Sequence, residues 1–184
     1  MSESTIKTNL PLKTGSSGRA VAQTIDNDLL VNLYHHITME RDANVQYFAM
    51  SLWLQERELK GFSSYFLNES KEEMDHAYKF TNYLIARGQF VKLNELKAPI
   101  QEWNSIEELI SYAFKMESDL TTSIQQIYSM ADRSLDIRTN VFLDPIIEKQ
   151  ISSEDELAHI LGKIKFASNQ PSALLIIDKD LSLK

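Results

Sequence analysis

The sequence predicts an all-α protein, a four-helix bundle with one long crossover and a short fifth helix at the C-terminal end. It contains only 5 glycines and 4 prolines in 184 residues, too few to punctuate a fold of many short strands. Apolar residues recur at helical spacing along four long segments, the pattern of amphipathic helices that share one core. The connection between the second and third segments is too long for a tight turn, which predicts the crossover.

Composition limits the classes of function. The chain has no cysteine, which excludes disulfides, thiolate metal sites and cysteine nucleophiles and suits a reducing, cytoplasmic location. Its net charge of -7 argues against a nucleic-acid partner and favours cations as the species it attracts. No window is apolar enough to span a membrane and the N-terminus lacks an apolar signal core, so we expect no membrane partner.

The N-terminal segment differs from the rest of the chain. Residues 1 to about 25 are rich in Ser, Thr, Lys and Gly and show no apolar periodicity. We expect a mobile or surface-bound arm there. Residues 26–184 are long enough to bury one core and should form a single domain.

The first helix is expected to begin near Asp26 or Asn27, either of which can cap it. It is expected to run to Lys60, with Gly61 as the C-terminal stop. The residues of its core-facing stripe are Leu30, Leu33, Ile37, Glu40, Asn44, Tyr47, Ser51 and Leu54.

A carboxylate and a phenol therefore interrupt this stripe. Glu40 and Tyr47 lie two turns apart on the same face and should both point into the core. Tyr47 also fits an ordinary core tyrosine with a bonded hydroxyl. His35 and His36 come earlier on the helix; adjacent histidines diverge too far to hold one metal together, and one of them should face solvent.

The second helix covers about residues 62–87 and should end at Gly88. Its stripe places Glu69, Glu73 and His76 among Phe62, Phe66, Phe80 and Leu84. Burying an unpaired carboxylate costs several kcal/mol, so a cation is expected to compensate. A Glu-x-x-His pair on an inward face is one way in which helix bundles hold two iron ions. Taken alone, the motif also fits a solvated helix face.

Residues 89–104, with Pro99, are expected to cross the length of the bundle, so that the second and third helices run parallel. Ser105 and Glu108 predict a capping box at the start of the third helix, which continues to about Asp132. Glu117 is the single charge on its otherwise apolar seam.

The fourth helix follows a turn around Asp136 and extends to about Phe166. Gln150 and Glu154 are the polar members of its stripe. A short fifth helix from Pro171 to about Leu181 has proline in its first turn. Its apolar run, Ala173-Leu174-Leu175-Ile176-Ile177, needs a partner surface, which we expect to come from other subunits.

Five strings on these helices carry a resemblance: ITMERDANVQYFAMSLW, YFLNESKEEMDHAYKF, FKMESDL, FLDPIIEKQ and ALLIIDKDLS. Over about residues 18–183 the chain resembles the ferritin family. It is most similar to the non-haem, heavy-chain-like ferritins of animals and their bacterial relatives.

The resemblance implies a set of iron ligands. Glu40 and His76 would ligate a first iron, Glu73 would bridge both ions, and Glu117 would ligate the second. Gln150 matches the glutamine that sits beside the second iron and hydrogen-bonds its ligands. Carboxylates with one imidazole suit Fe²⁺ that must exchange and Fe³⁺ after oxidation.

The resemblance also implies residues around the site. Tyr47 matches a phenol next to the two ions, and Glu72 matches a carboxylate that passes iron through. Asp144, with Glu148 one turn later, falls where family members line threefold channels with acids, and Glu69 and Glu72 would continue that relay inward. Surface acids favoured by a helix dipole are the alternative interpretation.

By the same resemblance the function would be oxidation of Fe²⁺ by O₂, with two iron ions per subunit, and storage of ferric mineral inside a shell of twenty-four identical subunits. Alternatives stay open. A haem-containing bacterioferritin would ligate haem through Met74. A rival metal site of the bacterioferritin type would use Glu156 and His159, which form a second Glu-x-x-His. A non-catalytic scaffold subunit and a DNA-protecting mini-ferritin are further alternatives.

Two positions depart from the family pattern. The run Gln150-Ile151-Ser152-Ser153 lacks the further glutamates that bacterial non-haem ferritins often place near the second iron, so no third iron site of that type is expected. Asp42 stands where relatives often have tyrosine.

Overall fold

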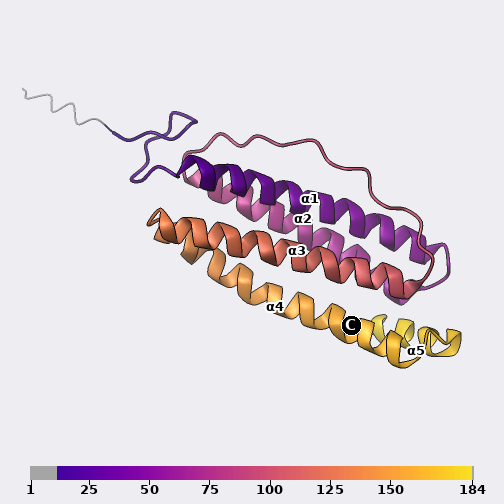
Figure 1. The fold of residues 1–184 in the computed structure, drawn as a ribbon. Helices are drawn as coiled ribbons and strands as arrows, with labels where there is room; N and C mark the ends of the chain where they lie inside the picture. Colours follow the sequence, from indigo (N-terminus) through magenta and orange to yellow (C-terminus); the bar gives the residue numbers. More distant parts are fainter. Residues whose placement is uncertain (1–11, 184) are drawn as a thin grey trace, which may run out of the picture.

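The computed structural model describes residues 12–183 and shows four long helices with a short fifth one (Figure 1). The helices are α1 (Asn27–Gln55), α2 (Lys60–Ala86), α3 (Ile106–Arg133), α4 (Ile137–Phe166) and α5 (Pro171–Leu181). The predicted fold class is confirmed. No helix among the described residues combines the length and the apolar character that crossing a membrane requires.

The connection between α2 and α3 runs along the whole bundle, so these two helices are parallel as predicted (Figure 1). Side chains of α1 hold it in place. Gln46 accepts a hydrogen bond from the Ile100 amide at 2.8 Å and donates one to the Ile100 carbonyl at 2.8 Å. Asp42 accepts the Lys97 amide at 3.0 Å. The carboxylate at position 42 therefore fastens the crossover to the bundle.

The predicted end of the first helix is wrong. α1 ends at Gln55 rather than Lys60. Glu58, with a left-handed backbone at φ 60°, lies in the turn that separates α1 from α2. Gly61 lies inside α2 and is not a stop. A Cβ at Gly61 would lie 1.7 Å from the Asp178 carbonyl oxygen of α5. Glycine at this position thus permits the close approach of α5, a requirement that helix-stop rules do not contain.

The described part of the N-terminal segment lies against the end of α2. The Ser17 amide donates to the Gly88 carbonyl at 3.1 Å, and the Phe90 amide donates to the Ser16 hydroxyl at 2.8 Å. Ile25, just before α1, is buried. Residues 1–11 of the predicted arm lie outside the described residues.

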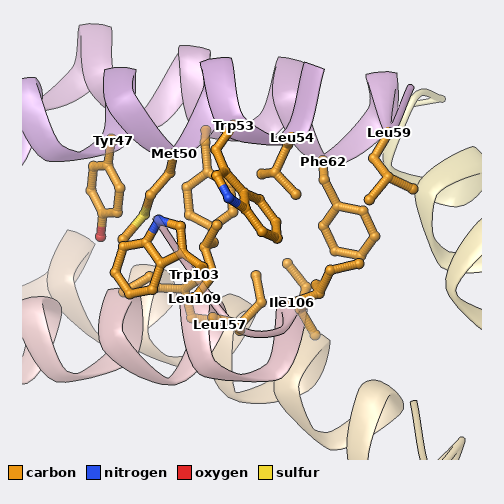
Figure 2. Packing of buried hydrophobic residues seen from close by; sticks show 14 of the residues in the cluster. Tyr47, Met50, Trp53, Leu54, Leu59, Phe62, Trp103, Ile106, Leu109 and Leu157 are labelled. Carbon is orange, nitrogen blue, oxygen red and sulfur yellow. The ribbon is translucent and has the colours of Figure 1, made fainter. Parts of the chain in front are cut away.

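The hydrophobic core consists of two clusters along the bundle axis. The larger one, seen in Figure 2, lies toward α5 and includes Met50, Trp53, Phe62, Trp103, Leu109 and Leu157. The other lies toward the opposite end and includes Leu33, Ile37, Phe80, Ile124 and Leu143. Tyr47 stands at one end of the labelled residues in Figure 2. The segments of α1 to α4 between the two clusters carry buried polar side chains.

Candidate metal centre

A polar layer crosses the bundle between the two clusters, and each long helix contributes to it. Helical spacing brings these side chains inward because they replace apolar members of each core-facing stripe. Exposure is 2% for Glu40, 3% for Glu73, 1% for Glu117 and 5% for Gln150. The sequence-predicted residues of this layer are Glu40 on α1, Glu73 and His76 on α2, Glu117 on α3 and Gln150 on α4.

One half of the layer groups Glu40, Glu73 and His76, which each offer a ligand atom within 4.8 Å of the other two. His76 Nδ1 lies 3.1 Å from Glu73 Oε2 and 3.8 Å from Glu40 Oε2. Glu40 Oε2 is buried and has no hydrogen-bond partner. An acceptor oxygen aimed into a site beside another carboxylate and an imidazole fits a bound metal cation.

The other half groups Glu69, Glu73 and Glu117, again with ligand atoms within 4.8 Å of one another. Gln150 Nε2 donates to Glu117 Oε2 at 2.5 Å and to the Glu117 carbonyl at 3.2 Å. The Tyr47 hydroxyl donates to Glu117 Oε1. Glu73 thus belongs to both groups, and Glu69, predicted as part of an access route, lies next to the buried site.

Burial and mutual repulsion dominate the electrostatics of the layer. Burial, followed by the charge of Glu40, raises the pKa of Glu73 well above its ordinary value. Burial likewise raises the pKa of Glu117. For Glu69, burial and then the charge of Glu72 raise the pKa to about 8. Such crowded carboxylates favour either protons or a metal cation among them.

Glu40 behaves differently from the other carboxylates. Burial acts to raise its pKa, but the charge of His36, in contact with Glu40, holds the pKa below its ordinary range. A lowered pKa favours the ionised form of the Glu40 carboxylate.

Tyr47 remains a protonated donor beside the site. Burial, then the charge of Glu117, raises its pKa well above the ordinary value. Its ring lies 5.6 Å from that of Phe66, centroid to centroid, at the edge of the larger hydrophobic cluster. The phenol therefore orients Glu117.

His36 is the site residue that the sequence reasoning missed. It is fully buried, and its Nε2 lies 2.8 Å from Glu40 Oε1 while Nδ1 lies 3.0 Å from Ser123 Oγ. Its place beside His35 suggested only an adjacent pair, whereas its position one turn before Glu40 is the signal that indicates its contact. His35 is exposed, as expected for one member of the pair.

The predicted access route is only partly assembled within one chain. Glu72 is half-exposed and forms an ion pair with Lys149, Nζ to Oε2, at 3.2 Å. Asp144 and Glu148 are exposed on α4 and belong to neither ligand group found among residues 12–183. The chain brings Glu69 to the buried layer but does not bring Asp144 there.

The alternative haem and metal motifs do not face the layer. His159 is exposed, so the Glu156-x-x-His159 pair does not point into the bundle as a unit. Met74 is 47% exposed on the outer side of α2. Glu154, predicted as a polar stripe member, is partly buried and accepts a hydrogen bond from the Thr121 hydroxyl.

Comparison with known proteins shows a family match and several similar relatives. A family model described as a ferritin-like domain matches residues 30–167. The bacterial non-heme ferritin of Escherichia coli is 26% identical over 155 residues, covering 84% of this chain and 94% of the relative. The bacterial non-heme ferritin of Staphylococcus epidermidis is 24% identical over 160 residues, covering 87% and 96%. The open pore ferritin of the archaeon Archaeoglobus fulgidus superposes with a TM-score of 0.84 at 29% identity, covering 87% of this chain and 98% of that one.

Proposed function

Because this chain belongs to the ferritin family, we propose that it oxidises Fe²⁺ to Fe³⁺ with O₂ at the buried polar layer and stores the product as ferric mineral. Iron is here both the substrate and the stored cargo. Carboxylates with one imidazole are ligands that accept Fe²⁺ and favour Fe³⁺, which suits a site that must take up iron and pass it on.

The observation that carries this proposal is the double membership of Glu73. A Glu73 oxygen lies within 4.8 Å of ligand atoms of Glu40 and His76 in one group, and of Glu69 and Glu117 in the other. A carboxylate has two oxygens, so it can bridge two cations. Two Fe²⁺ ions held side by side supply two electrons to one O₂ molecule, which a single ion cannot do. We therefore propose two iron ions per subunit.

The remaining side chains have distinct proposed roles. Gln150 fixes Glu117 as a ligand of the second ion through its 2.5 Å hydrogen bond. Tyr47, which also donates to Glu117, would supply an additional electron to reduced oxygen species and release its proton to the neighbouring carboxylates. Glu69 would receive iron as it enters or leaves the second position.

We also propose that copies of this chain assemble into a hollow shell of twenty-four subunits. The support within the chain is the apolar surface around α5, where Phe166 is 95% exposed, Leu175 60% and Ile176 64%. Contiguous apolar surface of this kind marks a protein interface. In the shell, Asp144 and Glu148 would draw Fe²⁺ inward toward Glu72 and Glu69.

Stopped-flow absorbance tests the proposed function. Metal-free protein is mixed in aerobic buffer with increasing Fe²⁺ up to several ions per subunit. We expect a fast oxidation phase that saturates at about two iron ions per subunit and is absent in Glu73→Ala. Asp75→Ala is the matched control, since Asp75 is an exposed carboxylate two residues further along α2.

Two results would contradict the proposal. Slow oxidation at the same rate in wild type and Glu73→Ala would mean that the buried carboxylates are structural. A Soret band in the purified protein would instead indicate bound haem and favour the bacterioferritin alternative.

A further inference from the structure

His36 is a buried ionisable side chain that belongs to neither ligand group. It is fully buried on α1, and its ring packs edge-on against Phe80 of α2 with centroids 4.5 Å apart. A histidine that only filled space there would be more costly than an apolar residue, because its two ring nitrogens need partners.

Nδ1 has a hydrogen-bond partner and Nε2 an ion-pair partner. Nδ1 lies 3.0 Å from the Ser123 hydroxyl of α3, and Nε2 lies 2.8 Å from Glu40 Oε1. A carboxylate only accepts hydrogen bonds, so the proton of the ring must face Glu40. The hydrogen bond between the other nitrogen and the Ser123 hydroxyl holds the ring in this orientation.

The consequence for Glu40 is an asymmetric carboxylate. Oε1 is engaged by His36, whereas Oε2 is buried without a hydrogen-bond partner and lies 3.8 Å from His76 Nδ1. The oxygen without a partner is the one that faces the rest of its ligand group. The carboxylate is thus oriented before any cation arrives.

We propose that His36 is a positioning residue, held by Ser123, that fixes Glu40 as a one-oxygen ligand of the first metal position. This inference rests on the proposed function, since it assigns a role at the same site. The contacts run from Ser123 of α3 through His36 to Glu40, both on α1, and they set the affinity of one metal position and leave the other unaffected. Removal of such a supporting contact typically weakens metal binding about 10–100-fold.

The test uses the full-length, metal-free protein and Co²⁺ under anaerobic conditions, with binding followed by calorimetry and visible absorption. In a Glu117→Ala background, which removes a ligand of the second position, we expect His36→Leu to weaken binding of the remaining ion by about 10–100-fold. His36→Gln keeps an N–H donor that reaches Glu40 and should restore most of the affinity. Ser123→Ala should give a smaller loss of the same kind.

A double-mutant cycle separates positioning from packing. If His36 acts through Glu40, His36→Leu should cause no further loss of Co²⁺ affinity in a Glu40→Ala background. His35→Leu is the matched control, because it makes the same substitution on the exposed neighbour and should leave binding unchanged. Thermal unfolding of each metal-free variant confirms that it is folded.

The outcomes are distinguishable. Wild-type protein that binds no Co²⁺ at this layer would overturn the proposed function itself. Wild-type binding together with unchanged affinity in His36→Leu would overturn only the role of His36. The role of His36 would also be overturned if His36→Leu and Glu40→Ala together weakened Co²⁺ binding by the full sum of their separate effects. The effect of His36→Leu would then arise from general loosening of the bundle.

Discussion

Replacing Glu73 by glutamine should stabilise the metal-free protein and destabilise the metal-loaded protein relative to wild type. Glu73 is 3% exposed, and the carboxylates of Glu40, Glu117 and Glu69 all act to raise its pKa, after the larger effect of burial. Its folded-state pKa lies above its unfolded value, so this group contributes stability at low pH that is lost as pH rises toward the folded pKa.

The size of the effect follows from burial. Glutamine has the shape of glutamate, carries no charge and can donate to the neighbouring carboxylates. Relief of a poorly compensated buried polar group is worth about 1–3 kcal/mol. For a chain of this size each kcal/mol shifts Tm by about 2–4 °C. We therefore expect the metal-free variant to melt at least about 2 °C above wild type at pH 7, and the difference to disappear near pH 4.5, the ordinary pKa of the group.

Metal should reverse this order. A ligand at 100 times its Kd stabilises a protein by about 2.7 kcal/mol, which is a rise in Tm of about 5–11 °C. Since Glu73 belongs to both ligand groups, the variant should lose most of this gain. The assay is differential scanning calorimetry with and without Zn²⁺, which cannot be oxidised. Glu72→Gln is the matched control, since Glu72 is half-exposed and its pair with Lys149 contributes little.

A metal-free Glu73→Gln protein that melts below wild type would contradict the predicted stabilisation, because the buried charge of Glu73 would then be compensated within the protein. The predicted loss of the metal effect is refuted if Zn²⁺ raises the Tm of the variant as much as that of wild type. The second result would mean that Glu73 holds no ion.

Three further predictions follow from the same structure. Burial is the chief cause that raises the pKa of Glu69 from 4.5 to about 8 in the folded protein. The free energy of unfolding of the metal-free protein should therefore fall as pH rises between these values. Glu69→Gln should remove about 1–3 kcal/mol of that fall, measured by urea melts at a series of pH values. Tyr47→Phe should still bind two Co²⁺ but slow the completion of oxygen reduction, seen as more peroxide released per iron; unchanged rates and products would exclude a redox role. Gly61→Ala should lower Tm by about 2–12 °C, because the new Cβ would lie 1.7 Å from the Asp178 carbonyl oxygen. Its control, Gly162→Ala in α4, meets no atom within 4 Å and should stabilise the helix by about 0.5–1 kcal/mol.

Local rules were sufficient where a feature depends on residues close in sequence. The third helix shows this, since Ile106, Ile110, Leu120 and Ile127, which lie at helical spacing along it, are buried together with Glu117. Asp26 caps α1 and Ser105 caps α3 as expected. Glu108, however, bonds to Asn104 rather than completing the capping box.

Local rules failed where a distant segment decides. Gly61 matched a helix stop, but glycine is needed there because the backbone of α5, far along the chain, approaches it closely. His36 was judged against His35, its neighbour in sequence, although its partner Ser123 lies 87 residues away. The ligand and transit roles assigned to Glu40, Glu72, His76, Gln150 and Asp144 stay predictions, which metal-binding measurements on the corresponding variants can test.

The amino-acid sequence by itself determined that several carboxylates, a histidine and a glutamine interrupt otherwise apolar helical stripes, because the helical period alone assigns a residue to a face. It also predicted that a cation compensates the burial of these carboxylates. Only the tertiary structure decided which oxygen of Glu40 has no partner, that Glu73 belongs to two ligand groups, and that Glu69 lies beside the buried site. Those facts depend on the register and spacing of helices packed against one another, which helical periodicity does not contain.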